Sequence, residues 1–395
     1  MTEESLFDNI RPYRDYEISL VISGLLESGY LEPLLKAIFP TTPYEVLKQQ
    51  LAGITTIKEF QSTIIYAVLK SILKASVTQF SYAGLEKLDK NTPWLFISNH
   101  RDIVLDPGLT NFALHENGFE TAEVAIGDNL LKEKWIEDLA KMNKSFMVRR
   151  NLQGRELVMA ARTLSDYIRH TIVDRKTSVW IAQREGRAKD GNDRTQPGLV
   201  NMLGMASKSA TLKEHYVALN IVPMAVSYEI DPCDIEKIRA IYVQRFGGGY
   251  KKLPGEDHEA MRKGILGNKG KLHIQFGNPI GQQIESLPDS LHKNDLHDAI
   301  CELVDFEIIE GYKLNATNYM AYDLFMQKTP DFTKYSQEDL ELFKSTAMSK
   351  AESIEGDKHE ILKIIYEISA NPLNNKLAQK EGPLQSFLAD KSNKA

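Results

Sequence analysis

The sequence predicts an α/β fold: a mixed, largely parallel central sheet flanked by helices, with an N-terminal helical region and a C-terminal helical extension. Short apolar runs bounded by turn residues recur between residues 94 and 277. Helical stretches lie between several of these runs, which is the pattern of a sheet covered by helices on both faces. Before and after this part of the chain, apolar residues recur at intervals of three and four, as in helices.

Three units follow from these patterns. A chain of 395 residues is long for a single core. We expect an N-terminal helical region at residues 1–80, an α/β domain at residues 81–283 and a C-terminal helical extension at residues 284–395.

In the first unit, the segment "FPTTP" at residues 39–43 separates two predicted helices, because proline ends a helix. Residues 57–76 form a longer amphipathic pattern that lysines interrupt. Such a helix packs against a neighbouring helix or lies on a lipid surface with its lysines at headgroup level, and the sequence leaves both open.

In the second unit, six apolar runs are predicted strands, and the run at 218–228 contains Pro223, which indicates a bulge or a strand end. The runs cover residues 94–99, 123–127, 144–149, 178–183, 218–228 and 271–277. The glycines at 247–249 and the Lys/Gly-rich piece that follows predict an exposed excursion before the last strand. In the third unit, helical periodicity resumes near Leu287, and the polar tail from Asn371 is predicted to fray.

Composition excludes several classes of protein. The net charge of −6 argues against a dedicated nucleic-acid binder. No apolar run reaches the length of about 18 residues that a membrane span needs. Cys233 and Cys301 have no metal-site spacing, so free thiols in a reducing compartment are expected.

The stretch "FISNHRDIVLDPG" is the first candidate site. His100 follows a predicted strand directly, and ligands of open α/β sheets collect at the carboxyl ends of strands. A histidine takes a proton from a hydroxyl near neutral pH, and does so better when a carboxylate fixes its tautomer. Asp106 and Asp102 are both close enough in sequence to be that carboxylate.

Two further stretches carry positive charge at strand ends. In "KSFMVRRNLQGRE", Arg149 and Arg150 follow a strand and suit a phosphate group, which arginine binds in a bidentate manner. In "IAQREGRAKDGNDRTQPG", a strand opens into a loop that contains Glu185, Gly186 and Arg187. Both stretches also fit ordinary exposed turns.

Together with "IVPMAVSYE", these stretches resemble, in order, the four motifs of the glycerol-3-phosphate / 1-acylglycerol-3-phosphate acyltransferase superfamily. They stand as "NHRDIVLDP", "FMVRR", "REGRAKDG" and "IVPMAVSYE", and "IQFGNPI" resembles the closing strand of that family. The resemblance spans residues 94–228.

The resemblance implies transfer of a fatty acyl group from acyl-CoA or acyl-carrier protein to a hydroxyl of a glycerol phosphate, in phospholipid synthesis. The acceptor is glycerol 3-phosphate or its 1-acyl form. His100 is the implied base and Asp106 its partner, and the implied substrate-binding residues are Arg149, Arg150, Glu185, Gly186, Arg187 and Lys189. Neither a cofactor nor a metal is implied.

The motifs depart from the family pattern at three places, one of which is the second motif, which lacks its usual glycine and has Met147 at a β-branched position. Five residues separate His100 from Asp106 where the family has four, so a bulge is expected and Asp102 is the rival partner. A single residue separates Glu185 from Arg187 where the family has two, so Lys189 is an alternative to that arginine.

The bilayer product of this reaction predicts a peripheral protein on the cytoplasmic face of the cell membrane, docking through the N-terminal helices or the lysine-rich excursion. A metal-dependent phosphohydrolase using His100, Asp102, Asp106 and Asp190 is one competing hypothesis. A non-catalytic lipid- or phosphate-binding relative is the other.

Overall fold

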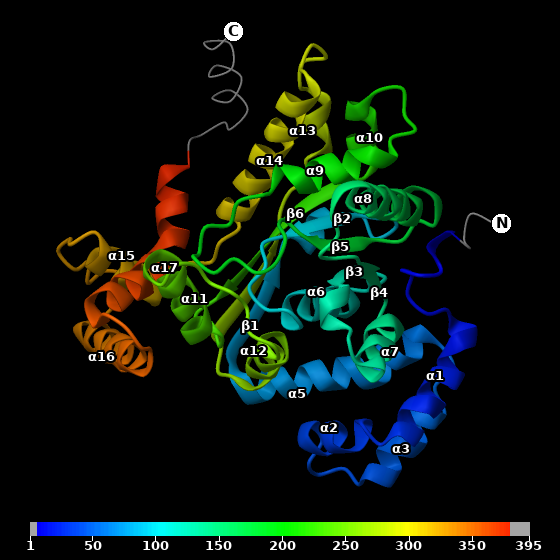
Figure 1. The fold of residues 1–395 in the computed structure, drawn as a ribbon, viewed down its shortest axis with the longest axis horizontal. Helices are drawn as coiled ribbons and strands as arrows, with labels where there is room; N and C mark the ends of the chain where they lie inside the picture. Colours follow the sequence, from blue (N-terminus) through cyan, green and yellow to red (C-terminus); the bar gives the residue numbers. More distant parts are fainter. Residues whose placement is uncertain (1–5, 380–395) are drawn as a thin grey trace.

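A computed structural model describes residues 6–379, and its centre is a seven-stranded sheet (Figure 1). The strand order is β1-β7-β6-β2-β5-β3-β4. β6 and β7 pair antiparallel, and the other neighbouring pairs are parallel. The strands are β1 Val77–Ala83, β2 Leu95–Ser98, β3 Glu123–Gly127, β4 Ser145–Val148, β5 Val179–Ala182, β6 Ile221–Tyr228 and β7 Gly270–Phe276. The predicted fold class, a mixed and largely parallel sheet flanked by helices, is therefore confirmed.

Helices cover both faces of this sheet, and further helices precede and follow it in the sequence. Before β2 these are α1 Asp15–Ser28, α2 Leu31–Ile38, α3 Tyr44–Ala52, α4 Ile57–Phe60 and α5 Tyr66–Ser76. Between β2 and β7 they are α6 Leu105–Glu116, α7 Lys134–Met142, α8 Gly154–Arg169, α9 Pro197–Leu203, α10 Leu212–Ala218, α11 Asp234–Phe246 and α12 Glu256–Leu266. After β7 they are α13 Gly281–Glu285, α14 Lys293–Glu310, α15 Ala316–Phe325, α16 Gln337–Ser353 and α17 Lys358–Ala378.

The period of two along the strands divides the core between the two faces. Leu95 and Ile97 of β2 pack with α8, α9 and α14, whereas Phe96 between them packs with α5 and α6. These side chains are fully buried, so β2 lies inside the molecule on both faces. Its carboxyl end, where His100 follows, is therefore held rigidly.

The first predicted unit contains one element that the sequence interpretation missed. β1 begins at Val77, directly after α5, and crosses the predicted boundary between residues 80 and 81. Its burial is only partial, because it is the edge strand of the sheet, and this hides the alternation expected of a strand.

Residues 57–76 form α4, a π-helical turn at Gln61–Ile65 and α5. Phe60, Ile64 and Leu69 are buried against neighbouring helices and the sheet. Of the two alternatives for this segment, packing is therefore the observed one, and its apolar face is not available to lipid.

Pro223 does not break β6, contrary to the sequence prediction. β6 is continuous from Ile221 to Tyr228, and its pairing with β7 begins only at Met224. The carbonyl of Pro223 accepts a hydrogen bond from the Gly277 amide at 2.8 Å, just past the end of β7. The missing N–H of Pro223 therefore removes no bond of the ladder.

Two further expectations are corrected. The excursion at residues 247–271 is not exposed throughout, because only its first part is an exposed turn and Glu256–Leu266 form α12. The tail does not fray at Asn371: α17 continues to Ala378, and Asn371 and Leu373 are buried. The rest of the predicted tail, from residue 380, lies outside the described residues. α11 and α17 pack on each other through Ile238, Ile361 and Ile364, and the Asn371 side chain is held against the Asp190 carbonyl.

Within residues 6–379, no single helix is long and apolar enough to cross a membrane. The helices α1 and α2, with a 90° bend between them, meet that length and composition only as a pair.

Candidate active site

His100 and Asp106 are in direct contact at the carboxyl end of β2. The Nδ1 atom of His100 lies 2.9 Å from Oδ2 of Asp106, which belongs to the first turn of α6. Asp106 is fully buried, and the His100 side chain is 13% exposed. Because a carboxylate accepts hydrogen bonds, Nδ1 carries the proton and Nε2 keeps its lone pair.

Three other donors hold the Asp106 carboxylate. The amides of Arg101 and Asp102 donate to Oδ2 at 2.6 and 2.9 Å, and the Tyr228 hydroxyl donates to Oδ1 at 2.9 Å. Burial, and then the neighbouring Asp106 carboxylate, raise the pKa of Tyr228 well above its usual value, so the phenol stays a donor. Tyr228 was not among the predicted site residues, although it ends the strand of the fourth motif.

Asp102, the rival partner, has a different place. Its Oδ1 accepts hydrogen bonds from the amides of Val104 and Leu105 at 2.9 and 2.8 Å, at the start of α6. It therefore holds the turn that leads into α6, and within the described residues it makes no hydrogen bond to the imidazole. The additional residue between His100 and Asp106 is accommodated in the turn before α6, and no strand bulge forms there.

Arg150, which follows β4, is the arginine of the second motif that contacts residues at the ends of other strands. Its Nη1 lies 2.6 Å from Oε1 of Glu185, which follows β5, and its amide donates to Asp128 at 3.1 Å. Arg149 next to it is exposed. The fold thus brings the ends of β3, β4 and β5 together through Arg150.

The third-motif loop is tied to the first motif by its backbone. The Ala188 amide donates to the His100 carbonyl at 3.1 Å. Gly186 is exposed and has φ +71°, a conformation that favours glycine. Arg187 comes near Asp102: burial raises the pKa of Asp102, and the Arg187 guanidinium opposes that rise.

The two cations proposed as alternatives in this loop have different surroundings. Nη1 of Arg187 is buried and has no hydrogen-bond partner among residues 6–379. Nζ of Lys189 lies 3.9 Å from the ring centroid of Tyr250, in the turn after α11. Arg187 is therefore the cation with an unused donor near the first motif.

A buried network around Asp193 was not predicted. Its Oδ2 accepts hydrogen bonds from Asn99 at 3.1 Å, Arg101 at 2.5 Å and Tyr312 at 2.7 Å. Asp193 is fully buried. The residues come from three separate parts of the sequence, so only the fold reveals that they act together to fix the loop of Arg101 beside His100.

The C-terminal extension supports the third-motif loop. Asp305 of α14 accepts hydrogen bonds from the amide and hydroxyl of Thr195 at 2.8 and 2.6 Å. Asn371 of α17 donates to the Asp190 carbonyl at 2.6 Å. The extension is therefore part of the framework of the site.

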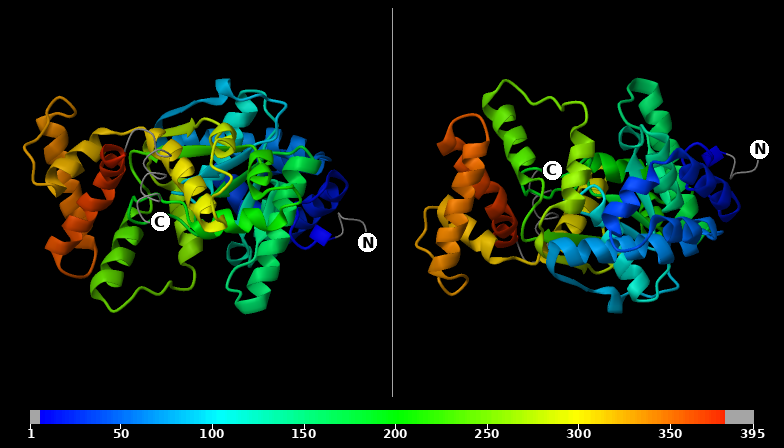
Figure 2. Two further views of the ribbon diagram at one scale, coloured as in Figure 1. Left: turned by 90° about the horizontal axis from the view of Figure 1, so that it is seen from above. Right: turned by 90° about the horizontal axis from the view of Figure 1, so that it is seen from below.

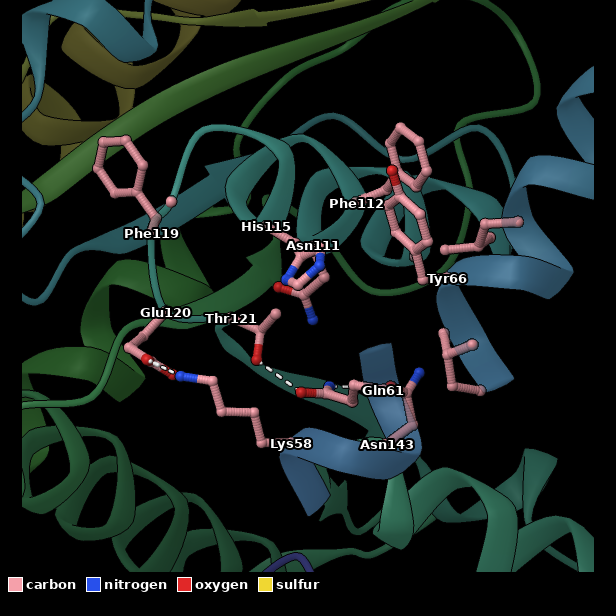
Figure 3. Close-up of a pocket in the computed structure, with 14 residues that line it drawn as sticks. Lys58, Gln61, Tyr66, Asn111, Phe112, His115, Phe119, Glu120, Thr121 and Asn143 are labelled. Atoms are coloured by element: carbon pink, nitrogen blue, oxygen red, sulfur yellow. Dashed lines mark hydrogen bonds and ion pairs between the residues drawn. The ribbon is translucent and has the colours of Figure 1, made fainter. Parts of the chain in front are cut away.

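A cavity of about 210 Å³ lies between α5 and α6, and Figure 3 shows the side chains that line it. Gly108, Asn111 and Phe112 of α6 face this cavity, whereas Asp106 faces the sheet from another side of the same helix. The Lys58–Glu120 ion pair, at 2.7 Å, lies at the polar end of the cavity. The cavity is therefore separate from the dyad.

The phosphohydrolase hypothesis required His100, Asp102, Asp106 and Asp190 to share a metal. Asp102 and Asp106 are engaged with backbone amides as described above, and no group of three or more potential ligands with metal-site geometry occurs within residues 6–379.

Cys233 and Cys301 are free and buried, and burial raises their thiol pKa to about 11 and about 12.

The acyltransferase family model matches residues 79–227, which contain the dyad, Arg150 and the third-motif loop. This segment is an acyltransferase domain. The resemblance noted in the motifs is therefore confirmed over the part of the chain that carries them.

Two other comparisons accompany this match. The chain is similar to a solved structure of the 1-acyl-sn-glycerophosphate acyltransferase PlsC from Thermotoga maritima, with 11% identity and a TM-score of 0.33. The similarity covers 72% of this chain and 91% of that chain. A search of curated proteins finds no match.

Proposed function

We propose that this acyltransferase moves a fatty acyl group from a thioester, acyl-CoA or acyl-carrier protein, to a hydroxyl of a glycerol phosphate. The observation that carries the proposal is the His100–Asp106 pair at the carboxyl end of β2, with Nε2 of His100 left as a proton acceptor. The acceptor is glycerol 3-phosphate or 1-acylglycerol 3-phosphate.

In the proposed reaction, Nε2 of His100 takes the proton of the acceptor hydroxyl while its oxygen attacks the thioester carbonyl carbon. A C–O bond forms, the C–S bond breaks, and the proton passes from the imidazolium to the leaving thiolate. Asp106 stabilises the imidazolium and holds its orientation. General base catalysis of this kind contributes about 10²–10⁴-fold in rate. Backbone N–H groups near the first or third motif are the proposed donors for the oxyanion.

Two arginines support a phosphate-bearing acceptor. Arg187 has a buried guanidinium nitrogen without a partner in the described part of the chain, and a buried unpaired donor is costly unless a ligand satisfies it. Arg150 is partly exposed, and its partner Glu185 is mostly exposed, so a phosphate has access to it. Arg149 and Lys189 are secondary candidates, because Arg149 is exposed and Lys189 lies over Tyr250.

The proposal is tested by an acyl-transfer assay with purified protein. Radiolabelled acyl-CoA and acyl-carrier protein are each offered with glycerol 3-phosphate and with 1-acylglycerol 3-phosphate. We expect product with at least one combination, and a loss of at least about 10²-fold in His100→Ala. Wild-type protein without transfer to either acceptor would refute the proposal, and so would full activity in His100→Ala, which instead fits a non-catalytic role for that residue.

We further propose that the enzyme works as a peripheral protein on the cytoplasmic face of the cell membrane, because the product partitions into the bilayer. Fractionation of cells is the measurement: the protein should sediment with membranes and be released by high salt or alkaline carbonate. Recovery in the soluble fraction at low salt would argue against it.

A further inference from the structure

Two segments project from the carboxyl side of the sheet, and both are apolar at their tips. One is the α8 tip, defined here as residues 154–159, in which every residue is exposed. The other is the α11–α12 loop, defined here as residues 246–255, in which every residue except Tyr250 is exposed. Figure 2 shows them on the same side of the molecule, at the bottom of the left view and the top of the right view.

The exposed apolar side chains of these segments are large. Leu157, Val158 and Met159 of the α8 tip are 50, 57 and 60% exposed, and Phe246 and Leu253 of the loop are 55 and 58% exposed. In α8, the buried residues begin only at Leu164, and the first six residues of the helix stand clear of the core. Apolar side chains clustered in this way mark an interaction surface.

Both segments lie in stretches whose charge is opposite to that of the chain, although the α8 tip by itself is neutral, with Arg155 beside Glu156. Residues 149–162 contain four arginines and one glutamate, and residues 245–255 contain one arginine and two lysines without an acidic residue. The whole chain has a net charge of −6. Cations beside protruding apolar side chains suit a surface that is negatively charged outside and apolar beneath, which describes an anionic lipid bilayer.

The topology places the candidate active site between the two segments. α8 follows β4 at one end of the strand order, and α11 follows β6 on the other side of β2. His100 follows β2, between them. A flat surface that contacts both segments therefore faces the carboxyl ends of the strands, where Arg150 and Glu185 also lie.

We propose that the α8 tip and the α11–α12 loop together form a docking surface for an anionic bilayer, which presents a membrane-borne acceptor directly to His100. The role of this surface in presenting an acceptor rests on the proposed function, whereas its binding to a bilayer does not require catalysis. The inference adds the α8 tip, which the sequence did not suggest, to the lysine-rich excursion, which it did. The N-terminal helices are the rival contact, because Tyr16 and Leu20 of α1 are 74 and 79% exposed. An acidic carrier protein is the alternative occupant of a basic surface, but it does not explain five exposed apolar side chains.

The test is flotation of the full chain with vesicles of phosphatidylethanolamine and phosphatidylglycerol, compared with vesicles of phosphatidylcholine alone. Leu157→Asp with Met159→Asp changes the tip, and Phe246→Asp with Leu253→Asp changes the loop. Each double variant should lower the partition coefficient at least about tenfold, because each removes two inserting side chains. Arg155→Glu with Lys251→Glu should weaken binding to the anionic vesicles about fivefold or more per charge, and wild-type binding should fall with salt.

Two matched double variants serve as controls. Leu342→Asp with Met348→Asp changes exposed apolar residues of α16 and should leave flotation unchanged. Tyr16→Asp with Leu20→Asp makes the same change on α1 and tests the N-terminal helices. Unchanged melting temperatures show that the folds are intact, as expected for exposed positions.

The outcomes separate the docking surface from the proposed function. Reduced flotation of the tip and loop variants, with unchanged turnover of a micellar or water-soluble acceptor, supports the surface. Flotation of these variants at the wild-type level, or loss confined to the α1 variant, overturns it. A raised KM for acyl-carrier protein with flotation unchanged assigns the surface to that protein and also overturns it. If no acyl transfer is found, the flotation result still decides the inference.

Discussion

The hydroxyl of Tyr228 donates to the Asp106 carboxylate at 2.9 Å, across 122 residues of sequence. This bond joins the end of β6 to the first turn of α6, and it fixes the carboxylate on the side opposite to the backbone amides that hold Oδ2. Tyr228 is therefore a positioning residue for His100 under the proposed function.

Replacing Tyr228 by phenylalanine should lower kcat by about tenfold, because removal of one buried hydrogen bond to a charged group costs about 1–3 kcal/mol. Steady-state kinetics with a saturating acceptor measures the effect. If Tyr228 acts only through the dyad, Tyr228→Phe should cause no further loss in a His100→Ala background. An equal loss in both backgrounds would mean that the phenol acts independently of His100.

The two aspartates of the first motif should respond differently to the same substitution. Asp106→Asn should lower kcat by about 10²–10⁴-fold, because the imidazole loses the charge that stabilises its protonated form. Asp102→Asn should stay within a few-fold of wild type, because the amide oxygen of asparagine can accept the same two backbone hydrogen bonds. The ratio of the two kcat values is the measurement, and a larger loss in Asp102→Asn would contradict the assignment of Asp106 as the partner.

Arg150 and Arg149 form a second matched pair. Arg150→Ala should raise the KM for the glycerol-phosphate acceptor by about tenfold or more, since a charge-assisted hydrogen bond contributes about 1.5–3 kcal/mol. Arg149→Ala should have a smaller effect, because this side chain is exposed. Initial rates measured against acceptor concentration give the KM of each variant. Equal rises in KM would contradict the prediction that Arg150 binds the acceptor and Arg149 does not.

Asp305 should make the stability of the protein depend on pH. Burial raises the pKa of its carboxyl from 3.8 to about 6. A carboxyl whose folded pKa lies above the unfolded value stabilises the fold fully below the unfolded value, and this contribution is lost as the pH rises through the folded value. The free energy of unfolding should therefore fall between about pH 4 and pH 6, by on the order of 3 kcal/mol from this group.

Asp305→Asn removes this titration, so its free energy of unfolding should vary less over the same range. Denaturant unfolding at a series of pH values compares the two proteins. Parallel curves for wild type and variant would show that Asp305 does not titrate in this range. The Thr195 contacts of Asp305 make some overall destabilisation of the variant expected, but the slope with pH is the deciding quantity.

Gly264 of α12 fits against Asp102, in the turn before α6. A Cβ atom at this position would lie 2.0 Å from Oδ2 of Asp102. Gly264→Ala should therefore destabilise the protein by about 1–3 kcal/mol, through overpacking of a buried contact. Gly24→Ala in α1 is the control: nothing lies within 4 Å of its Cβ position, so alanine should stabilise that helix by about 0.5–1 kcal/mol. Opposite signs in thermal melts are expected, and a stabilising Gly264→Ala would show that α12 does not pack tightly on α6.

The local patterns of the sequence were sufficient for much of the fold. Buried strands such as Leu95–Ser98 are short apolar runs bounded by turns, and these six runs became β2 to β7. β1 was missed because an edge strand is only partly buried and lacks a clear alternation. Asn371 was misjudged because its burial comes from packing of α17 on distant parts of the chain, which local polarity does not report.

The sequence by itself determined that His100 stands at a strand end with two aspartates in reach, and that arginines follow two other strands, because spacing along a chain fixes these relationships. Only the tertiary structure decided that Asp106 contacts the imidazole while Asp102 holds the turn before α6. It alone joined Tyr228, Asp193 and Tyr312 to the site. The physical reason is that buried polar groups must find partners in space, and those partners come from segments far apart in sequence.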